Sequence, residues 1–300
     1  MATNPTFQLF SSSNDNSSNG SSLGLGFLDS PEPPRPLPPP PVEVLSSEHV
    51  SSSVKFAVEK VAIGELTLLK GRVNTKDVFG LPNSDLVPGV YEGGLKLWEG
   101  SIDLVKILEK EVHNGNLPFS GKRVLELGCG HGLPGIYSCL KNADAVHFQD
   151  FNAEVLRCLT IPNLNANLSE KSASASTSGS SEVRFFSGDW SAVHQLLPHI
   201  NDGENNINGG KASGYDIILM AETIYSISGQ QSLYGLIKKC LACPNGVVYM
   251  AAKKYYFGVG GGTRQFLSMI ERDGVLASTL VSEITDGSSN VREVWKLSYK

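Results

Sequence analysis

Residues 123–135 read RVLELGCGHGLPG, an apolar run that breaks into glycines. The apolar half is typical of a buried strand, and glycines after a strand allow a tight turn and close approach of the backbone to a ligand. The pattern overlaps the G-x-G-x-x-G signature of dinucleotide sites imperfectly, because Gly130 and Gly135 are out of step with it. The stretch therefore predicts a strand–turn–helix ligand site, and it leaves open whether the ligand carries a phosphate.

Strand-like and helix-like segments alternate along the chain around this stretch. Strands are predicted at 123–129, 145–151, 183–190, 215–225, 246–256, 277–284 and 291–299, with one or two more over 54–73. Helices are predicted at 133–143, 153–167, 191–197, 229–241 and 263–274, with one more from Leu97. Such alternation predicts a parallel sheet, and the last two strands predict an antiparallel hairpin because no helix separates them. The predicted fold class is α/β: a Rossmann-like, seven-strand, mostly parallel sheet with a C-terminal antiparallel hairpin and helices on both faces.

Composition divides the chain into a tail and one domain. Residues 11–22 read SSSNDNSSNGSS, and residues 31–41 hold eight prolines. Neither stretch can bury enough apolar surface to offset the entropy lost on ordering. Two polar segments later in the chain have the composition of inserted loops. We expect a disordered Ser/Asn- and Pro-rich tail over 1–50, a single domain over 51–300, and flexible inserted loops at 168–182 and 199–214.

Charge and residue spacing argue against several classes of function. The net charge of −5 and the lack of a basic block argue against direct nucleic-acid binding. The six histidines show no metal-site spacing, so no metal is expected. The sequence contains no run of 18 apolar residues, so no membrane span is predicted. Five cysteines, mostly within core-like segments, suit a reducing compartment, so we expect a cytoplasmic and nuclear protein.

Two acidic residues beside the glycines indicate the kind of ligand. Glu126 lies two residues before Gly128, where a carboxylate would repel a pyrophosphate and suit a cationic group. Asp150 closes the next predicted strand, where an acidic side chain can bind both ribose hydroxyls. S-adenosylmethionine has a ribose, an ammonium and a sulfonium group but no phosphate, so it is favoured over nicotinamide cofactors. The structural alternatives are that Glu126 is a capped or paired strand residue and that Asp150 caps the next helix.

Six blocks, taken together and in this order, resemble the histidine protein methyltransferases, a eukaryotic family that methylates a histidine of a large-subunit ribosomal protein. The resemblance runs from about residue 54 to 300. The blocks are SDLVPGVYEGGLKLWE (84–99), VLELGCGHGLPGIYS (124–138), FQDFN (148–152), FSGDW (186–190), AETIYS (221–226) and AAKKYYFGVGGG (251–262).

The resemblance implies which residues bind the methyl donor and the acceptor. With the two carboxylates above, the residues expected to bind S-adenosylmethionine are Leu97, Trp98, Glu99, Gly100, Ser101, Glu126, Gly128, Gly130, Gln149, Asp150, Phe151, Gly188, Asp189, Trp190 and Ala221. The candidates for orienting the acceptor are Glu222, Tyr225 and Asp189. Asn152 is expected to cap a helix, His131 to be a variable position of the loop, and 255–262 to close on a peptide unless it is only a flexible turn.

Four hypotheses remain at this point. The first is a monomeric protein-histidine methyltransferase, since a neutral imidazole is a ready nucleophile near pH 7. The second is a protein-lysine methyltransferase on the same scaffold. The third is a non-catalytic cofactor-binding adaptor that acts through the proline-rich tail. The fourth, a nicotinamide oxidoreductase, is disfavoured by Glu126 and the closing hairpin.

Overall fold

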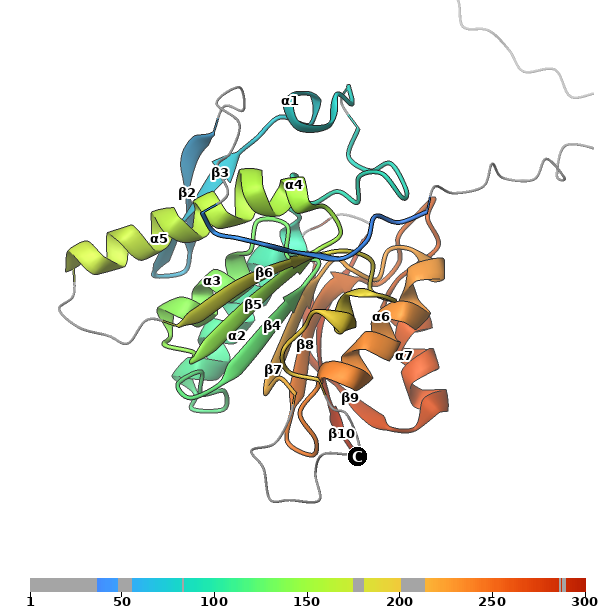
Figure 1. The fold of residues 1–300 in the computed structure, drawn as a ribbon. Coiled ribbons are helices and arrows are strands. Elements are labelled where there is room, and N and C mark those ends of the chain that lie inside the picture. The colour runs from blue at the N-terminus through green and yellow to red at the C-terminus, as the bar shows by residue number, and fades with distance from the viewer. Residues whose placement is uncertain are drawn as a thin grey trace, which may run out of the picture. The chain divides into compact units, whose positions relative to one another are not determined.

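A computed structural model describes residues 37–47, 56–82, 84–174, 181–200, 214–285, 287 and 290–300. The chain divides into two units, Met1–Arg35 and Pro36–Lys300, and the first lies outside the described residues. The second unit is built on one large sheet with helices on both of its faces (Figure 1).

The large sheet has eight strands in the order β1-β6-β5-β4-β7-β8-β10-β9. The central strands are parallel, whereas β1 and β10 are antiparallel to their neighbours, and β10 lies between β8 and β9. This confirms the predicted α/β class and the C-terminal hairpin. The strands are β1 Val42–Val44, β4 Arg123–Leu127, β5 Ala145–Asp150, β6 Glu182–Ser187, β7 Ile217–Ala221, β8 Val247–Lys253, β9 Leu276–Ile284 and β10 Arg292–Tyr299.

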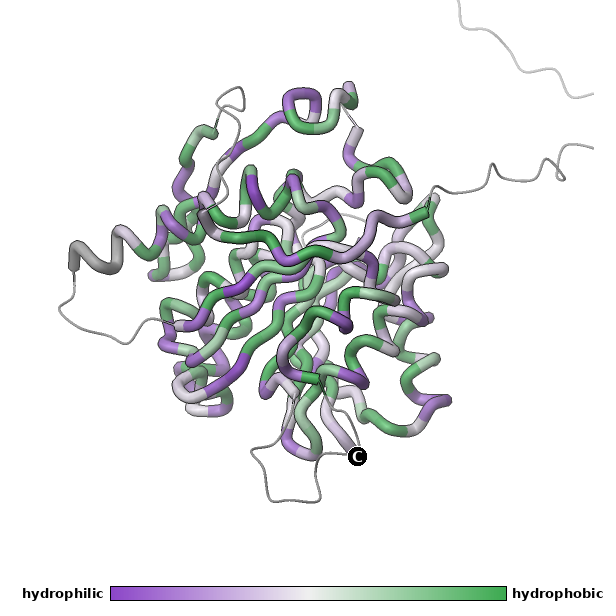
Figure 2. The backbone as a smooth tube through the Cα atoms, in the orientation of Figure 1, coloured by the Kyte–Doolittle hydropathy of each residue, from purple (hydrophilic) through white to green (hydrophobic). Residues whose placement is uncertain are grey.

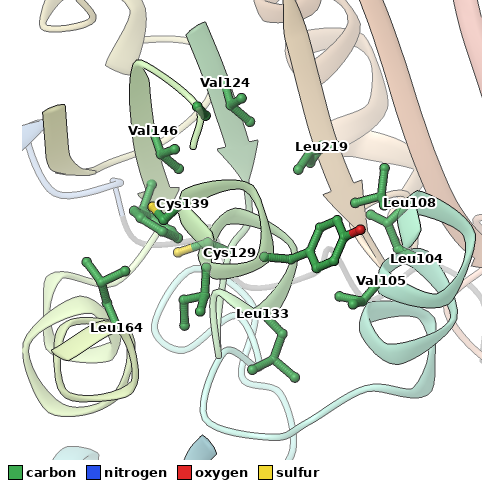
Figure 3. Close-up of a cluster of buried hydrophobic side chains, with 14 of the residues drawn as sticks. Leu104, Val105, Leu108, Val124, Cys129, Leu133, Cys139, Val146, Leu164 and Leu219 are labelled. Carbon is green, nitrogen blue, oxygen red and sulfur yellow. The ribbon is translucent and has the colours of Figure 1, made fainter. Parts of the chain in front are cut away.

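The helices form one layer on each face of this sheet. Along the tube, hydrophobic and hydrophilic residues alternate in the helices, which is the pattern of segments with one buried face (Figure 2). One core joins α2, α3 and α5 to the central strands, and its buried side chains include Leu104, Leu133, Leu164, Val124 and Val146 (Figure 3). A second core joins α6 and α7 to the opposite face. The helices are α1 Thr75–Phe79, α2 Glu99–His113, α3 Leu133–Leu140, α4 Ala153–Val155, α5 Ile161–Ser174, α6 Ile227–Cys240 and α7 Thr263–Asp273, with a π turn at Leu156–Thr160 and a 3₁₀ turn at Val193–Gln195.

A separate antiparallel hairpin, β2 Ala57–Ile63 and β3 Leu66–Arg72, is held by the side chains of α5. Asn163 accepts a hydrogen bond from the Gly71 backbone N–H at 2.5 Å. Asn167, one turn later, accepts from the Leu69 N–H at 2.9 Å and donates to the Leu69 carbonyl at 2.7 Å. The buried side-chain amides of Asn163 and Asn167 therefore pair with backbone groups of β3 on the edge where β3 has no neighbouring strand.

Two predicted boundaries require correction. Residues 42–44, assigned to the disordered tail, form β1 and pair with β6, and Val44 is buried in the core. The predicted loop 168–182 is shorter, because α5 continues to Ser174 and β6 begins at Glu182. Most of the predicted loop 199–214 and most of the tail, all but residues 37–47, lie outside the described residues. Within the described part of the chain, no helix is long and apolar enough to cross a membrane.

Substitution of Asn167 by Ala tests how the hairpin is held. It removes both hydrogen bonds to Leu69 and leaves buried backbone groups unpaired, so we expect the free energy of unfolding to fall by about 2 kcal/mol in a urea titration. Asn165→Ala is the matched control, because Asn165 lies on the exposed face of the same helix. Equal losses in the two variants would show that the amide does not hold β3.

Candidate functional site

The site lies at the carboxyl ends of β5, β4 and β7, which are adjacent in the sheet. The chain leaves β4 toward β5 on one side and later adds β7 on the other, so the strand order reverses at β4. Ligands of open parallel sheets bind in the crevice at such a reversal. The glycine loop after β4, Asp150 at the end of β5 and Glu222 after β7 all meet here.

The glycine loop is fixed by side chains from the neighbouring strand. Gly128 and Gly130 have left-handed φ angles of 59° and 49°. The Gly128 N–H donates to Oε1 of Gln149 at 3.2 Å, and the Gly130 N–H donates to Oδ2 of Asp150 at 2.9 Å. A Cβ at Gly128 would lie 2.7 Å from Cγ2 of Thr223, so this position must remain glycine for the loop to approach β7.

Glu126 makes a structural contact, as a capping or paired residue does, and this is the alternative that its sequence position left open. Its Oε2 accepts a hydrogen bond from the Gly135 N–H at 2.8 Å, within the first turn of α3. The side chain is buried, and burial raises the pKa of its carboxyl well above the usual value. Glu126 therefore fastens the start of α3 to β4, and the expectation that it faces a cationic ligand group has no support from these contacts.

Asp150 combines burial with several hydrogen bonds. Its Oδ1 accepts from the Asn152 N–H at 3.0 Å, while Oδ2 accepts from Gly130. Burial raises the pKa of this carboxyl to about 6, and the nearby charge of Glu92 adds to the rise, whereas the backbone N–H groups oppose it. Each carboxylate oxygen has a second lone pair, so two hydroxyl donors can still be accommodated.

Gln149 ties the glycine loop to the end of β6. Its Oε1 also accepts from Trp190 Nε1 at 3.0 Å, and its Nε2 donates to the Gly188 carbonyl at 2.9 Å. The Trp190 ring thereby reaches across the sheet end, because a Cβ at Gly128 would lie 3.8 Å from this ring. Gly128, Gly188 and Trp190 thus form one corner around a fully buried amide.

The segment before α2 lies over the glycine loop. A Cβ at Gly130 would be 2.9 Å from the Gly94 carbonyl oxygen, and the His131 ring is 3.1 Å from the Leu95 carbonyl oxygen. Burial lowers the pKa of His131 to about 4, so its neutral ring donates to Leu95 and holds this segment. His131 therefore has a structural contact and is not an unconstrained position of the loop.

Asn152 holds the same segment from the other side. It occupies the N-cap position of α4, but its side chain makes no capping hydrogen bond, contrary to the prediction. Instead its Nδ2 donates to the Val90 carbonyl at 2.8 Å, and its Oδ1 accepts from the Glu92 N–H at 3.1 Å. The residue that was expected to start a helix therefore fixes Glu92 at the site.

Glu222 is the carboxylate best placed for an acceptor. It has a left-handed φ of 58°, which is uncommon outside glycine, and only 7% of it is exposed. Burial raises the pKa of its carboxyl and the charge of Glu99 adds to the rise, while the Tyr256 hydroxyl, Lys253 and the Gly100 N–H oppose it. Its Oε2 accepts from the Tyr256 hydroxyl. Although the Gly100 N–H faces the carboxylate, Oε1 makes no hydrogen bond of normal geometry to the described residues.

Gly100, in the first turn of α2, faces the unpaired oxygen of Glu222. A Cβ at Gly100 would lie 2.6 Å from Oε1, so a larger residue would fill this space. Two more buried hydroxyl oxygens, Ser101 Oγ at the start of α2 and Thr223 Oγ1 after β7, also lack a partner within the part of the chain that the structure describes. Unpaired buried polar atoms are costly, which indicates that a polar ligand satisfies them.

Two tyrosines connect this carboxylate to the rest of the site. Tyr225 donates its hydroxyl proton to Glu92, and its ring meets the Tyr256 ring edge-on with centroids 6.5 Å apart. Glu92 and Tyr256 were not singled out from the sequence, although both lie within the quoted blocks. Their role depends on contacts across 133 and 34 residues, which no local pattern reveals.

Asp189 is the weaker of the two candidate carboxylates. Its Oδ1 accepts from both the N–H and the hydroxyl of Ser191, at 2.9 and 2.5 Å, so it closes a local turn. It follows β6, which is three strand spacings from β7, or about 14 Å. Asp189 and Glu222 therefore cannot orient the same acceptor nitrogen, and the unpaired oxygen of Glu222 favours Glu222.

The remaining predicted residues surround the same crevice. Trp98 precedes α2 and donates from Nε1 to the Gly93 carbonyl at 3.0 Å, and Glu99 is exposed in the first helical turn. Leu97, Phe151 and Ala221 are partly buried. The arrangement fits a nucleoside with an amino-acid arm, with Asp150 and Trp190 at the nucleoside end and Gly100 and Ser101 at the other, where Glu222 adjoins them.

Comparisons with known proteins agree with this chemistry. A family model described as lysine methyltransferase matches residues 89–273. A histidine protein methyltransferase 1 homolog of Dictyostelium discoideum is 44% identical over 220 residues, covering 73% of this chain and 62% of the relative. The homolog of Rattus norvegicus is 35% identical over 255 residues, covering 80% and 65%. The chain thus spans somewhat less than two thirds of these relatives.

A relative with a different named activity is more distant. The mouse EEF1A lysine methyltransferase 3 is 24% identical over 160 residues, covering 53% of this chain and 55% of the relative. The greater similarity to the histidine enzymes bears on the choice of acceptor, since the two kinds of enzyme share one scaffold.

Substitution of Gly128 by Ala tests the close approach of the loop. The new Cβ would meet Thr223 and adopt an unfavourable left-handed φ, so we expect the Kd for S-adenosylhomocysteine to rise at least about ten-fold by calorimetry. Gly235→Ala is the control, because a Cβ there meets nothing within 4 Å. An unchanged Kd for Gly128→Ala would place the ligand elsewhere.

The raised pKa of Asp150 predicts a pH dependence of ligand binding. Ribose hydroxyls donate best to the ionised carboxylate, so affinity for S-adenosylhomocysteine should increase as pH rises from about 5 through the folded pKa of about 6 and then level off. Asp150→Asn should bind more weakly and lose this dependence, whereas Asp144→Asn, at the opposite end of β5, should keep it. A wild-type affinity that is flat across this range would contradict the assignment.

The same pKa has a consequence for folding. Because the folded value of about 6 lies above the ordinary 3.8, Asp150 favours the folded state at low pH, and this contribution is lost as pH rises through 6.

Proposed function

The chain belongs to the methyltransferase family whose model matches residues 89–273, as its sequence blocks predicted, and we propose that it is a protein-histidine N-methyltransferase. S-adenosylmethionine is the donor, and a histidine of a large-subunit ribosomal protein is the acceptor. The proposal is supported by relatives named histidine protein methyltransferases and by the sequence blocks that resemble that family. We also propose that the enzyme acts in the cytoplasm and nucleus, and that it acts as a monomer.

The observation that carries the proposal is the buried Glu222 carboxylate with one unpaired oxygen. A neutral imidazole has one nitrogen with a lone pair and one N–H, so it can attack with the first only if the second is satisfied. Glu222 Oε1 accepts that N–H and thereby selects the tautomer whose free nitrogen faces the methyl group. Tyr256 holds the other carboxylate oxygen and fixes its direction.

The remaining steps are positioning and proton transfer. S-adenosylmethionine supplies a methyl group on a positively charged sulfur and departs as a neutral thioether, so no general acid is needed. As the imidazole nitrogen forms its bond to carbon, positive charge spreads over the ring, and Glu222 stabilises that charge. Glu222 then takes the ring proton and passes it to water. The enzyme gains most of its rate from holding the acceptor nitrogen in line with the methyl group.

Glu222→Gln tests this role. The variant keeps the size of the side chain but loses the negative charge, so we expect kcat to fall about 10²-fold or more, while the Kd for S-adenosylhomocysteine changes by less than about three-fold. Glu271→Gln, on the exposed face of α7, is the matched control and should leave kcat unchanged. If kcat survived in Glu222→Gln, another group would have to hold the ring proton.

The loop after β8 is the surface that meets the protein substrate. Its backbone is fixed to the Glu222 segment, since Gly261 donates to the Tyr225 carbonyl at 3.0 Å and Gly262 to the Ile224 carbonyl at 3.1 Å. Next to Tyr256, which points inward to Glu222, Tyr255 and Phe257 are 51% and 73% exposed. An apolar surface thus borders the acceptor position, as expected for recognition of a peptide.

Phe257→Ala tests this surface. We expect the KM for the protein substrate to rise about five-fold or more, with the cofactor Kd unchanged, because a large apolar contact is lost only on the substrate side. Leu280→Ala, on β9 at the far edge of the sheet and 44% exposed, should leave KM unchanged. A rise in cofactor Kd without a change in KM would contradict the assignment.

The acceptor itself is tested by mapping. The chain is incubated with labelled S-adenosylmethionine and free large-subunit ribosomal proteins, and the modified residue is identified by mass spectrometry. Methylated histidine that is lost with Asp150→Ala supports the proposal. Methylated lysine would move the chain to the lysine enzymes of the family, and cofactor binding without transfer would favour the adaptor hypothesis.

A further inference from the structure

The start of the described chain forms a strand that the proposed reaction does not yet use. β1 pairs antiparallel with β6 in the register Val42↔Ser187, Glu43↔Phe186 and Val44↔Phe185. In Figure 1 it is the blue segment that runs along β6 at the edge of the sheet. Glu43 and Arg184 join the two strands through two hydrogen bonds of 2.7 Å each, from Nε and from Nη2 of the guanidinium. The pairing is therefore specific in both register and charge.

This register places Pro41 against Gly188. A Cβ at Gly188 would lie 2.8 Å from Cβ and 2.9 Å from Cα of Pro41, and Gly188 has a φ of 140°. Proline has no N–H to continue the ladder, so the pairing ends here and the ring packs directly on the glycine backbone. The outer side of the Gly188 corner is thus closed by the residue that precedes β1.

Gly188 transmits this contact to the crevice. Its N–H donates to the Asp150 carbonyl at 3.0 Å, and its own carbonyl accepts from Gln149 Nε2 at 2.9 Å. The same Gln149 amide holds the Gly128 N–H and the Trp190 ring. The backbone of Gly188 therefore connects Pro41 to the groups assigned to the nucleoside end of the donor.

We propose that β1 and Pro41 are a positioning part of the cofactor site, which docks on β6 and fixes the Gly188–Trp190 corner for the adenine end of the donor. The inference rests on the proposed function only for the location of the donor, and it does not depend on which residue is methylated. Pro41 acts through Gly188 and Gln149 and is a positioning residue rather than a catalytic one.

Thermodynamic reciprocity makes the proposal testable in the unaltered protein. If docking of β1 strengthens donor binding, then donor binding must strengthen docking of β1 by the same factor. A strand that only covers the sheet edge would be indifferent to the ligand.

The experiment is hydrogen–deuterium exchange of the full chain with and without S-adenosylhomocysteine. We expect exchange in 42–46 to slow at least about three-fold with ligand, together with 128–132 in the glycine loop, while the β2–β3 hairpin stays unchanged. Protection of 128–132 without any change in 42–46 would overturn the proposal. Protection of neither segment would contradict the location of the donor as well as this inference.

Charge reversal provides a second measurement. Glu43→Arg and Arg184→Glu each place like charges across the strands, so each should increase exchange in 42–46 and raise the Kd for S-adenosylhomocysteine about three- to ten-fold. The double reversal should restore both quantities. Reversal of the Glu59–Lys70 pair in the β2–β3 hairpin is the control and should change neither.

The two proposals fail in different ways. Faster exchange in 42–46 with an unchanged Kd would overturn the role of β1 and leave the methyltransferase proposal intact. Protection of both 42–46 and 128–132 in a protein that methylates no histidine would support the role of β1 and overturn the methyltransferase proposal.

Discussion

The arrangement of the site depends on the end of β5, where two adjacent buried polar side chains hold the loops around them. Gln149 holds Gly128 and the Gly188–Trp190 corner, and Asp150 holds Gly130 and the start of the next helix. Both side chains are buried, so their hydrogen bonds are made inside a low-dielectric surrounding, where an unpaired group would be costly. A displacement of β5 would therefore move the glycine loop and the Gly188–Trp190 corner together.

At the Glu222 end of the site, the position of the carboxylate depends on a strained backbone at Glu222 and on the absence of a side chain at Gly100. Glu222 adopts a left-handed backbone conformation that costs about 1 kcal/mol, and such strain persists only where surrounding contacts impose it. Tyr256 holds one carboxylate oxygen, and glycine at position 100 leaves the space into which the other points. A carboxylate fixed in this way needs little reorganisation when charge develops on an acceptor beside it.

Much of this was accessible from the sequence because the relevant signals are local. The apolar run before Gly128, the alternation of strands with helices and the acidic residue closing β5 each follow from a short stretch. The six blocks contain Glu222 and Tyr225, which follow β7 at the carboxyl edge of the sheet. The order of the strands was not predicted, and the adjacent positions of β5, β4 and β7 are a finding of the structure.

What the sequence did not reveal depends on partners far along the chain. Glu126 was expected to face a ligand, but its carboxylate accepts a hydrogen bond from the Gly135 N–H. The residue pattern around Glu126 does not indicate this partner. Asn152 has the residue type of a helix cap, yet its amide pairs with residues 60 and 62 positions earlier. β1 is only three residues long and follows a proline run, so its pairing with β6 has no periodic signal.

The central claim is that the donor lies between the Asp150–Trp190 corner and Glu222, with its sulfur toward Glu222. A crystal structure of the protein with S-adenosylhomocysteine tests this most directly. We expect both ribose hydroxyls on Asp150, adenine beside Trp190 and the sulfur toward Glu222 and Tyr225. Adenine beside Glu222, or a ribose that does not contact Asp150, would contradict it.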